Sequence, residues 1–255
     1  DINRVSEGAR LQLRAPNPAP WSGKESGSVK VVVQVPAGVL VDIEAMYFDV
    51  VATGPFRGVL IPASLGRLEI ADVEGRVELA TANRKITLKN VTGDVSAQTS
   101  NSSLTASNIV SPKGQAVFRN DGGEIRIDGF TGEISARNDF GRIEIAHFTP
   151  TGRRNVIRGQ SAPIVLDLAE LGSSQLVVSN RLEDIDITVP SAMSGVLTLA
   201  VDQGGRIEVS SLKFQTDLVQ RDRLGIVVGD GDGFISGSIS GRGNVYIRGR
   251  DQGEN

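Results

Sequence analysis

Pairs of apolar residues recur along this chain with a spacing of about eighteen residues. The clearest copy reads GQAVFRNDGGEIRIDGFT at 114–131 and is followed by GEISARNDFGRIEIAHFT at 132–149, so that Ile125 falls on Ile143 and Phe130 on Phe148. In each copy apolar and polar residues alternate, which is the pattern of a β-strand with one buried face. A turn rich in Asn, Asp and Gly, which tolerate positive φ angles, separates the two strands.

The same spacing continues on both sides of this pair. The apolar residues that fall in register, or in a looser phase after residue 149, are Val41, Ile43, Val50, Ala52, Val59, Ile61, Leu68, Ile70, Val73, Val77, Leu79, Ile86, Leu88, Val91, Val95, Ala97, Leu104, Ala106, Ile109, Leu176, Val178, Ile185, Ile187, Leu197, Leu199, Ile207, Val209, Leu212, Val245 and Ile247. Extra residues at 111–113 and near 149–151 fall at predicted corners, where they leave the strand register intact.

A single repeat cannot bury its apolar face, whereas stacked repeats bury it against one another. We therefore predict an all-β fold, a parallel β-helix or β-solenoid of about ten turns with 18–21 residues per turn. Each turn is expected to hold two short strands, or three if a corner forms one, and Val245 and Ile247 to close the series. This register also predicts cross-strand ion pairs, Arg126 with Glu144 and Glu124 with Arg142.

The pattern divides the chain into three parts. We expect an N-terminal arm or cap at 1–28, one solenoid domain at 29–250 and a disordered tail at 251–255. The solenoid is expected to open with a strand, a Pro-Gly turn and its first turn over 29–43. Two stretches break the rhythm and are expected to be irregular, 153–172 and 213–224, the second as a loop or short helix.

Composition excludes several classes of function. The formal net charge is -3 and no basic block is present, which argues against nucleic-acid binding. The chain has no cysteine, so disulfides, thiolate metal sites and a cysteine nucleophile are excluded. No apolar run approaches the ~18–20 residues of a membrane-spanning helix, and we expect no transmembrane segment in this chain.

The segment VQVPAG at 33–38, followed by GRLEIADVEGRVELATANRKITLKNVTGDVSAQT at 66–99, resembles a bacterial family named the putative-adhesin family (domain of unknown function 4097). The resemblance covers about 29–250. It implies a β-solenoid and an exported or envelope setting, and it carries no catalytic residues to transfer.

Two motifs have the residue types of a chemical site. His147 is the only histidine, with no second His, no Cys and no carboxylate at metal spacing nearby, and it falls at a corner where Gly129 stands one repeat earlier. We expect it to be structural. GDGDGF at 229–234 offers Asp230 and Asp232 as calcium ligands, but it lacks the later Glu of an EF-hand loop, and a Gly-Asp turn is the favoured interpretation.

Stacked acids and arginines could form a glycan site. The pairs Asp184/Asp186 and Asp121/Asp139 resemble the carboxylates of polysaccharide-cleaving enzymes, although Asp121 and Asp139 also lie in Asn-Asp-Gly-type turns, where acids are expected. Arg119-Asn120-Asp121 and Arg137-Asn138-Asp139 would stack into a polar stripe. The stripe could bind an anionic glycan, and we favour a solvated face with internal hydrogen bonds.

These observations assign no catalytic, cofactor-binding or metal-binding residue and no cofactor. We expect a non-enzymatic structural or adhesive module of the bacterial cell envelope, extracytoplasmic, whose repeat surface binds another macromolecule, either protein or glycan. The alternative is a carbohydrate-active β-helix that binds or cleaves polysaccharide. Self-association through the solenoid ends is a third hypothesis.

Overall fold

The computed structural model describes residues 2–5, 8–11 and 30–250. The chain divides into two units, residues 1–35 and 36–255. In the first unit, β1 (Ile2–Val5) and β2 (Gly8–Leu11) form an antiparallel pair. The rest of the predicted arm at 1–28 and the predicted tail at 251–255 lie outside the described residues, so the structure does not test those predictions.

Over its described residues, 36–250, the second unit is a β-solenoid without helices, which confirms the predicted fold class. Its strands are β3 (Leu40–Asp42), β4 (Val50–Ser64), β5 (Leu68–Ala82), β6 (Ile86–Thr92), β7 (Val95–Ser100), β8 (Leu104–Asn120), β9 (Ile125–Asn138), β10 (Ile143–Pro150), β11 (Asn155–Gly159), β12 (Ile164–Leu168), β13 (Gln175–Asn180), β14 (Ile185–Pro190), β15 (Gly195–Val201), β16 (Ile207–Ser210), β17 (Gln215–Val219), β18 (Arg223–Val228), β19 (Gly233–Ile239) and β20 (Val245–Arg250).

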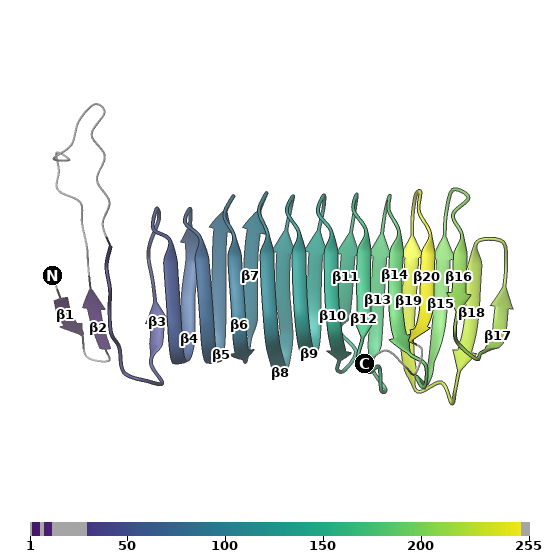
Figure 1. Ribbon diagram of the computed structural model, residues 1–255, viewed down its shortest axis with the longest axis horizontal. Coiled ribbons are helices and arrows are strands. Elements are labelled where there is room, and N and C mark those ends of the chain that lie inside the picture. The colour runs from purple at the N-terminus through teal and green to yellow at the C-terminus, as the bar shows by residue number, and fades with distance from the viewer. Residues whose placement is uncertain (1, 6–7, 12–29, 251–255) are drawn as a thin grey trace, which may run out of the picture. The chain divides into compact units, whose positions relative to one another are not determined.

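Apart from β17 and β18, these strands form two faces, each made of parallel strands. Strands of successive turns lie side by side in Figure 1. Face A contains β3, β7, β11, β13, β19 and β15 with the C-terminal halves of β4, β5, β8 and β9. Face B contains β6, β10, β12, β14, β20 and β16 with the N-terminal halves of the same four strands. Those four strands continue round a corner, where two expected short strands merge into one of 14 to 17 residues.

About seven turns stack one on another, against the ten or so that the repeat count predicted. The regular series follows the order of the chain from β4 to β14, and the repeats that come later in the chain do not continue it in that order. The extra residues at 111–113 cause a register shift between Ser111 and Gln115, after which the pairing of β8 with β9 resumes. Corner insertions therefore leave the ladder intact, as predicted.

The predicted register is confirmed in the core. Ile125 pairs with Ile143 and Phe130 with Phe148, and all four side chains are buried. The Phe130 ring lies 5.8 Å from that of Phe148, centroid to centroid, and 6.1 Å from that of Phe118. Apolar residues at the two ends of the stack, such as Val41 and Ile207, are only half-buried, because a turn at an end has one neighbouring turn instead of two.

Glycine recurs at some corners because the backbones of successive turns approach closely there. A Cβ at Gly141 would lie 1.9 Å from the carbonyl oxygen of Gly123, one turn earlier. Any larger residue would have to push the two turns apart. The Gly123 to Gly141 repeat is therefore a packing requirement of the stack.

A ladder of polar side chains lies inside the solenoid at the end of face A. Asn120, Asn138 and Asn180 are buried, as are Thr81 and Thr99 at the same level of earlier turns. Asn138 Nδ2 donates to the carbonyl oxygen of Gly123 at 2.5 Å, and its Oδ1 accepts from the Gly141 N–H at 3.2 Å. The predicted stacking of Asn120 on Asn138 is confirmed, and so are the expected internal hydrogen bonds of these amides. The expectation that the two asparagines lie on a solvated face is wrong, because both are buried and satisfy backbone groups of the turn.

The last turn of the chain does not close the series. β19 pairs with β13 on one side and β15 on the other, and β20 likewise lies between β14 and β16. Figure 1 shows these two yellow strands inserted among the green strands that precede them in the chain. The expectation that Val245 and Ile247 end the stack is therefore wrong; Val245 pairs with both Ile185 and Ile207.

Three local expectations are corrected. The segment 153–172, expected to be irregular, contains β11 and β12, each paired in register on both sides. The segment 213–224 does break the parallel pattern, but as an antiparallel hairpin of β17 with β18 and not as a loop or helix. Residues 30–35 form no strand, whereas the predicted turn follows at 37–38, with Gly38 at a φ of 72°.

Candidate functional site

The outer surface of face A between β8 and β13 consists of columns of side chains. Alternate residues point outward, and the register places them in line from turn to turn. Column 2 contains Val117, Ser135, Val156 and Val177, and column 3 contains Arg119, Arg137, Arg158 and Ser179. Column 1 contains Gln115 and Glu133, which pair in register, then Arg154, which directly precedes β11 and contacts Glu133, and Gln175 at the start of β13. Adjacent members of a column belong to neighbouring strands, about 4.8 Å apart. Long side chains thus flank a central column of short ones.

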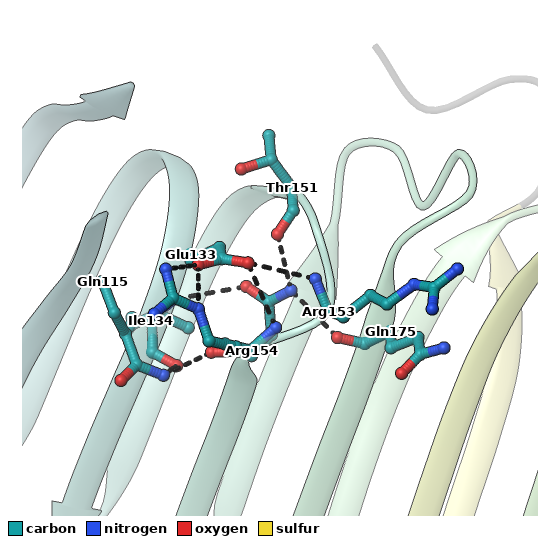
Figure 2. A network of polar contacts seen from close by, with 8 residues as sticks. Gln115, Glu133, Ile134, Thr151, Arg153, Arg154 and Gln175 are labelled. Carbon is teal, nitrogen blue, oxygen red and sulfur yellow. Dashed lines mark hydrogen bonds and ion pairs between the residues drawn. The ribbon is translucent and has the colours of Figure 1, made fainter. Parts of the chain in front are cut away.

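Glu133 is the centre of a polar network in column 1 (Figure 2). Its Oε2 accepts from Arg154 Nε at 2.7 Å, and its Oε1 accepts from the backbone N–H groups of Arg153 and Arg154 at 3.1 and 3.3 Å. The Glu133 side chain is 16% exposed. The hydrogen bond from the Arg154 side chain, helped by those two backbone groups, holds the pKa of Glu133 below its usual value of 4.5.

Neighbouring amides tie this network to the adjacent turns. Asn155 is buried; its Oδ1 accepts from the Ile134 N–H, and its Nδ2 donates to the carbonyl oxygens of Thr151 and Gln175, each at 2.9 Å. Gln115 donates to the backbone carbonyl of Arg154. These contacts join four successive turns and fix the Glu133–Arg154 ion pair of column 1 in place.

Column 3 is cationic. Arg119, Arg137 and Arg158 are partners in register on consecutive strands, and all three side chains are exposed. Arg137 forms an ion pair with Asp139 at 3.1 Å. Over the described part of the chain, Arg119 and Arg158 have no ion-pair partner. Like charges placed directly opposite on neighbouring strands destabilise a sheet, so this column is a cost to the fold that packing alone does not explain.

Sequence reasoning identified part of this column and missed the rest. It brought Arg119 and Arg137 together through the stacked Arg-Asn-Asp motifs. It missed Arg158 because 153–172 was expected to be irregular. The spacing of 21 residues between Arg137 and Arg158, within the range of the other turns, was the signal that could have found it.

His147 lies at the corner position predicted for it. Its φ is 50°, and Gly129 one turn earlier has a φ of 72°. The sequence offers no carboxylate at metal spacing near His147, but the structure brings Asp128 beside it, with His147 Nδ1 2.7 Å from Asp128 Oδ1. Sequence spacing concealed this contact, since Asp128 belongs to the neighbouring turn. Both side chains are more than 60% exposed, at 66% and 62%.

The GDGDGF motif forms the turn between β18 and β19. Gly229 and Gly231 have φ angles of 59° and 82°, and the Ser194 hydroxyl accepts from the backbone N–H groups of Asp230 and Asp232. The favoured turn is therefore present. Across residues 2–5, 8–11 and 30–250, no three or more His, Cys, Asp or Glu side chains gather as a metal site would require.

The two acid pairs have different surroundings. Asp184 Oδ1 accepts from the Asn244 backbone N–H at 2.7 Å, and Asp186 forms an ion pair with Arg248 at 3.3 Å. These two acids therefore hold the inserted last turn. Asp121 and Asp139 belong to successive turns, but Asp139 is engaged by Arg137.

Two further predictions were tested on the surface. Arg126 pairs with Glu144 at 3.3 Å, as predicted. Arg142 also lies against Glu144, at 3.1 Å, instead of forming the expected pair with Glu124.

Within the described ranges no helix has the length and apolar character needed to cross a bilayer.

Comparison with known proteins assigns no family to this chain. No family model matches the chain, and no curated protein matches it. One solved structure is similar, described as a "putative cell adhesion protein" from Clostridium sporogenes, at 11% identity and a TM-score of 0.26. The match covers 69% of this chain and 59% of that one. The chain thus spans less than two thirds of the solved structure that it matches.

Proposed function

We propose that this chain is a non-enzymatic adhesive or interaction module of the bacterial cell envelope, and that it belongs to the putative-adhesin family which its sequence resembles. It acts outside the cytoplasm and binds another macromolecule through the outer surface of face A between β8 and β13. The observation that carries this proposal is the register of columns 1 to 3, in which successive turns repeat the same outward positions.

A surface built in this way suits an extended partner. The backbone ladder fixes the spacing of the outward side chains, and the Glu133 network holds column 1 in one arrangement. A surface that is already ordered loses less conformational entropy when a partner binds. A polymer running along the stack would meet the same three columns at every turn.

The state of the acids supports binding over catalysis. A general acid at neutral pH needs a raised pKa, whereas the carboxyls with displaced pKa values have them lowered. The backbone N–H of Arg67 lowers the pKa of Asp49, and the Arg154 side chain lowers that of Glu133. Three of the four acids that sequence reasoning considered as catalytic make structural contacts: Asp184 with Asn244, Asp186 with Arg248 and Asp139 with Arg137.

Binding of the purified chain to isolated bacterial cell envelopes tests this proposal. We expect saturable co-sedimentation that is abolished by Ser135→Glu together with Val156→Glu, which place two acids in column 2. The matched control is Thr87→Glu with Thr105→Glu, at outward positions of face B, and it should bind as the wild type does. The proposal fails if both double variants bind equally, if nothing binds saturably, or if the chain cleaves the polymer it binds.

A further inference from the structure

We infer that the Arg119, Arg137 and Arg158 column binds the carboxylates of a linear acidic polysaccharide lying along the axis of the stack. This inference rests on the proposed function and names the class of partner. It starts from the three guanidinium groups in register on β8, β9 and β11.

The column presents positive charge that the fold leaves largely uncompensated. Asp139 engages only Arg137, and in the part of the chain that the structure describes Arg119 and Arg158 have no acidic partner. Three like charges at a strand spacing of about 4.8 Å repel one another. Anions arriving in the same repeat would relieve that repulsion, and a guanidinium binds a carboxylate through two parallel hydrogen bonds.

The neighbouring columns favour a sugar polymer on the same surface. Val117, Ser135 and Val156 in column 2 are short, so they form a floor beside the arginines, apolar for the faces of sugar rings and with one hydroxyl. On the far side of that floor, Arg154 is neutralised by Glu133. Gln115 and Gln175 complete column 1 as polar, uncharged side chains. Within columns 1 to 3, unpaired cationic side chains therefore occur in column 3 and not in column 1.

The charge balance favours a uronate-type polymer over a nucleic acid. The chain has a formal net charge of -3, and three arginines in one line are few for a surface that must hold a phosphate backbone. A polyuronate carries one carboxylate on each sugar, so its charges recur in a single file, as those of column 3 do. Nucleic-acid binding is treated as a competing outcome of the experiment.

The test measures the affinity of the full chain for polygalacturonate by isothermal titration calorimetry, with dextran as a neutral polymer and single-stranded DNA as a second polyanion. The test variant is Arg119→Gln, Arg137→Gln and Arg158→Gln together. The control, Lys89→Gln, Arg126→Gln and Arg142→Gln, removes the same charge from the face B side. Far-UV circular dichroism checks that both variants keep the β fold.

The wild type and the control should bind polygalacturonate with affinities within about twofold of each other, and the test variant at least about tenfold more weakly. Dextran should not bind. Equal loss in both variants, or tighter binding of DNA than of polygalacturonate, would overturn the inference. The inference would also be overturned if the wild type bound envelopes, lost that binding in the column 2 variant, and yet did not bind polygalacturonate. In that case the proposed function would stand and only the class of partner would be wrong.

Discussion

At the scale of single residues, position in the repeat determines the role of a side chain more than its chemical type does. Asn138 is buried and Asn108 is exposed, although both are asparagines in a repeated position. The first satisfies backbone groups inside the solenoid. The second donates to Asn90 Oδ1 on the previous turn at 3.1 Å, in an outer ladder at the corner. Substitutions should therefore have effects that follow the position.

Replacing Ile127 by Asp should unfold much of the solenoid. Ile127 is fully buried, and an unpaired buried charge costs several kcal/mol, about 3–5. Glu144→Lys removes two outer ion pairs, with Arg126 and Arg142, and should cost about 2 kcal/mol at most. Thermal melts followed by circular dichroism measure both. Equal losses of stability would show that the inward and outward assignments are wrong.

Asn138→Ala should destabilise the chain by about 1–3 kcal/mol, because it leaves backbone groups of the half-buried Gly123 and Gly141 without the partners that the buried amide supplies. Asn108→Gly is the control: it removes an exposed hydrogen bond but keeps a residue that tolerates the φ of 54° at that corner. Urea unfolding compares the two variants. A control as costly as the test would mean that burial is not the cause.

Glu133 should make stability depend on pH in the acid range. Its pKa is lowered in the folded chain, so its stabilising contribution is complete above its usual value of 4.5 and is lost as the pH falls through the lowered value. Glu133→Gln should melt roughly 2 °C below the wild type at pH 7, and the gap should close towards pH 3. Glu170→Gln, at an exposed position, should show no such trend. A gap that is constant with pH would contradict the argument.

At the scale of elements, the last turn of the chain, β19 and β20, connects β15 and β16 to the earlier turns. β15 and β16 contact the rest of the solenoid through β19 and β20, which arrive later in the chain. Asp184, Asp186 and Asp167 of preceding turns bind Asn244, Arg248 and Arg250 of the last one. Polar contacts across 60 or more residues of sequence thus help to hold the inserted turn.

Disulfide formation can test this insertion, since the chain has no cysteine of its own. Val177 pairs with Ser236 of β19, and Ser236 in turn with Thr198 of β15. We expect Val177→Cys with Ser236→Cys to cross-link under mild oxidation. Val177→Cys with Thr198→Cys should not, because two strand spacings of about 4.8 Å exceed the Cα separation that a disulfide spans. Cross-linking of the second pair instead would mean that the turns stack in chain order.

The terminal hairpin bears on the hypothesis of self-association through the ends. β17 is exposed along its whole length, and among the described strands it pairs with β18 alone. The register of this pair shifts between Thr216 and Leu218, with Asp217 at the shift. Bulges and charged residues on an edge strand discourage pairing with another chain. The edge that β17 forms at this end of the stack is therefore poorly suited to pair with a second copy.

At the scale of the whole molecule, the sequence contained the repeat but not the complete order of stacking. Alternation at Ile125 and Ile127, and the glycines at corners, are local signals, so they predicted the fold and the register of β8, β9 and β10. Alternation shows that a strand has a buried face but not which strand lies beside it, and the place of Val245 between Ile185 and Ile207 was hidden for that reason.

The candidate surface was predictable to the same extent. Arg119 and Arg137 are 18 residues apart and were seen to stack, whereas Arg158 follows an insertion at a corner and was not. The Asn138 amide was placed outside because its polarity suggests solvent, while the backbone groups that it satisfies are visible only once the turns are stacked.

Both the core and the arginine column depend on turns that stack in register. Cysteine pairs that include column 2 residues test this stacking most directly. Val117 of β8 is the partner of Ser135 of β9. Val117→Cys with Ser135→Cys should cross-link almost completely under mild oxidation, while Arg119→Cys with Ser135→Cys, two residues out of register, should cross-link little. Efficient cross-linking of the second pair, or none of the first, would contradict the register and with it the arginine column.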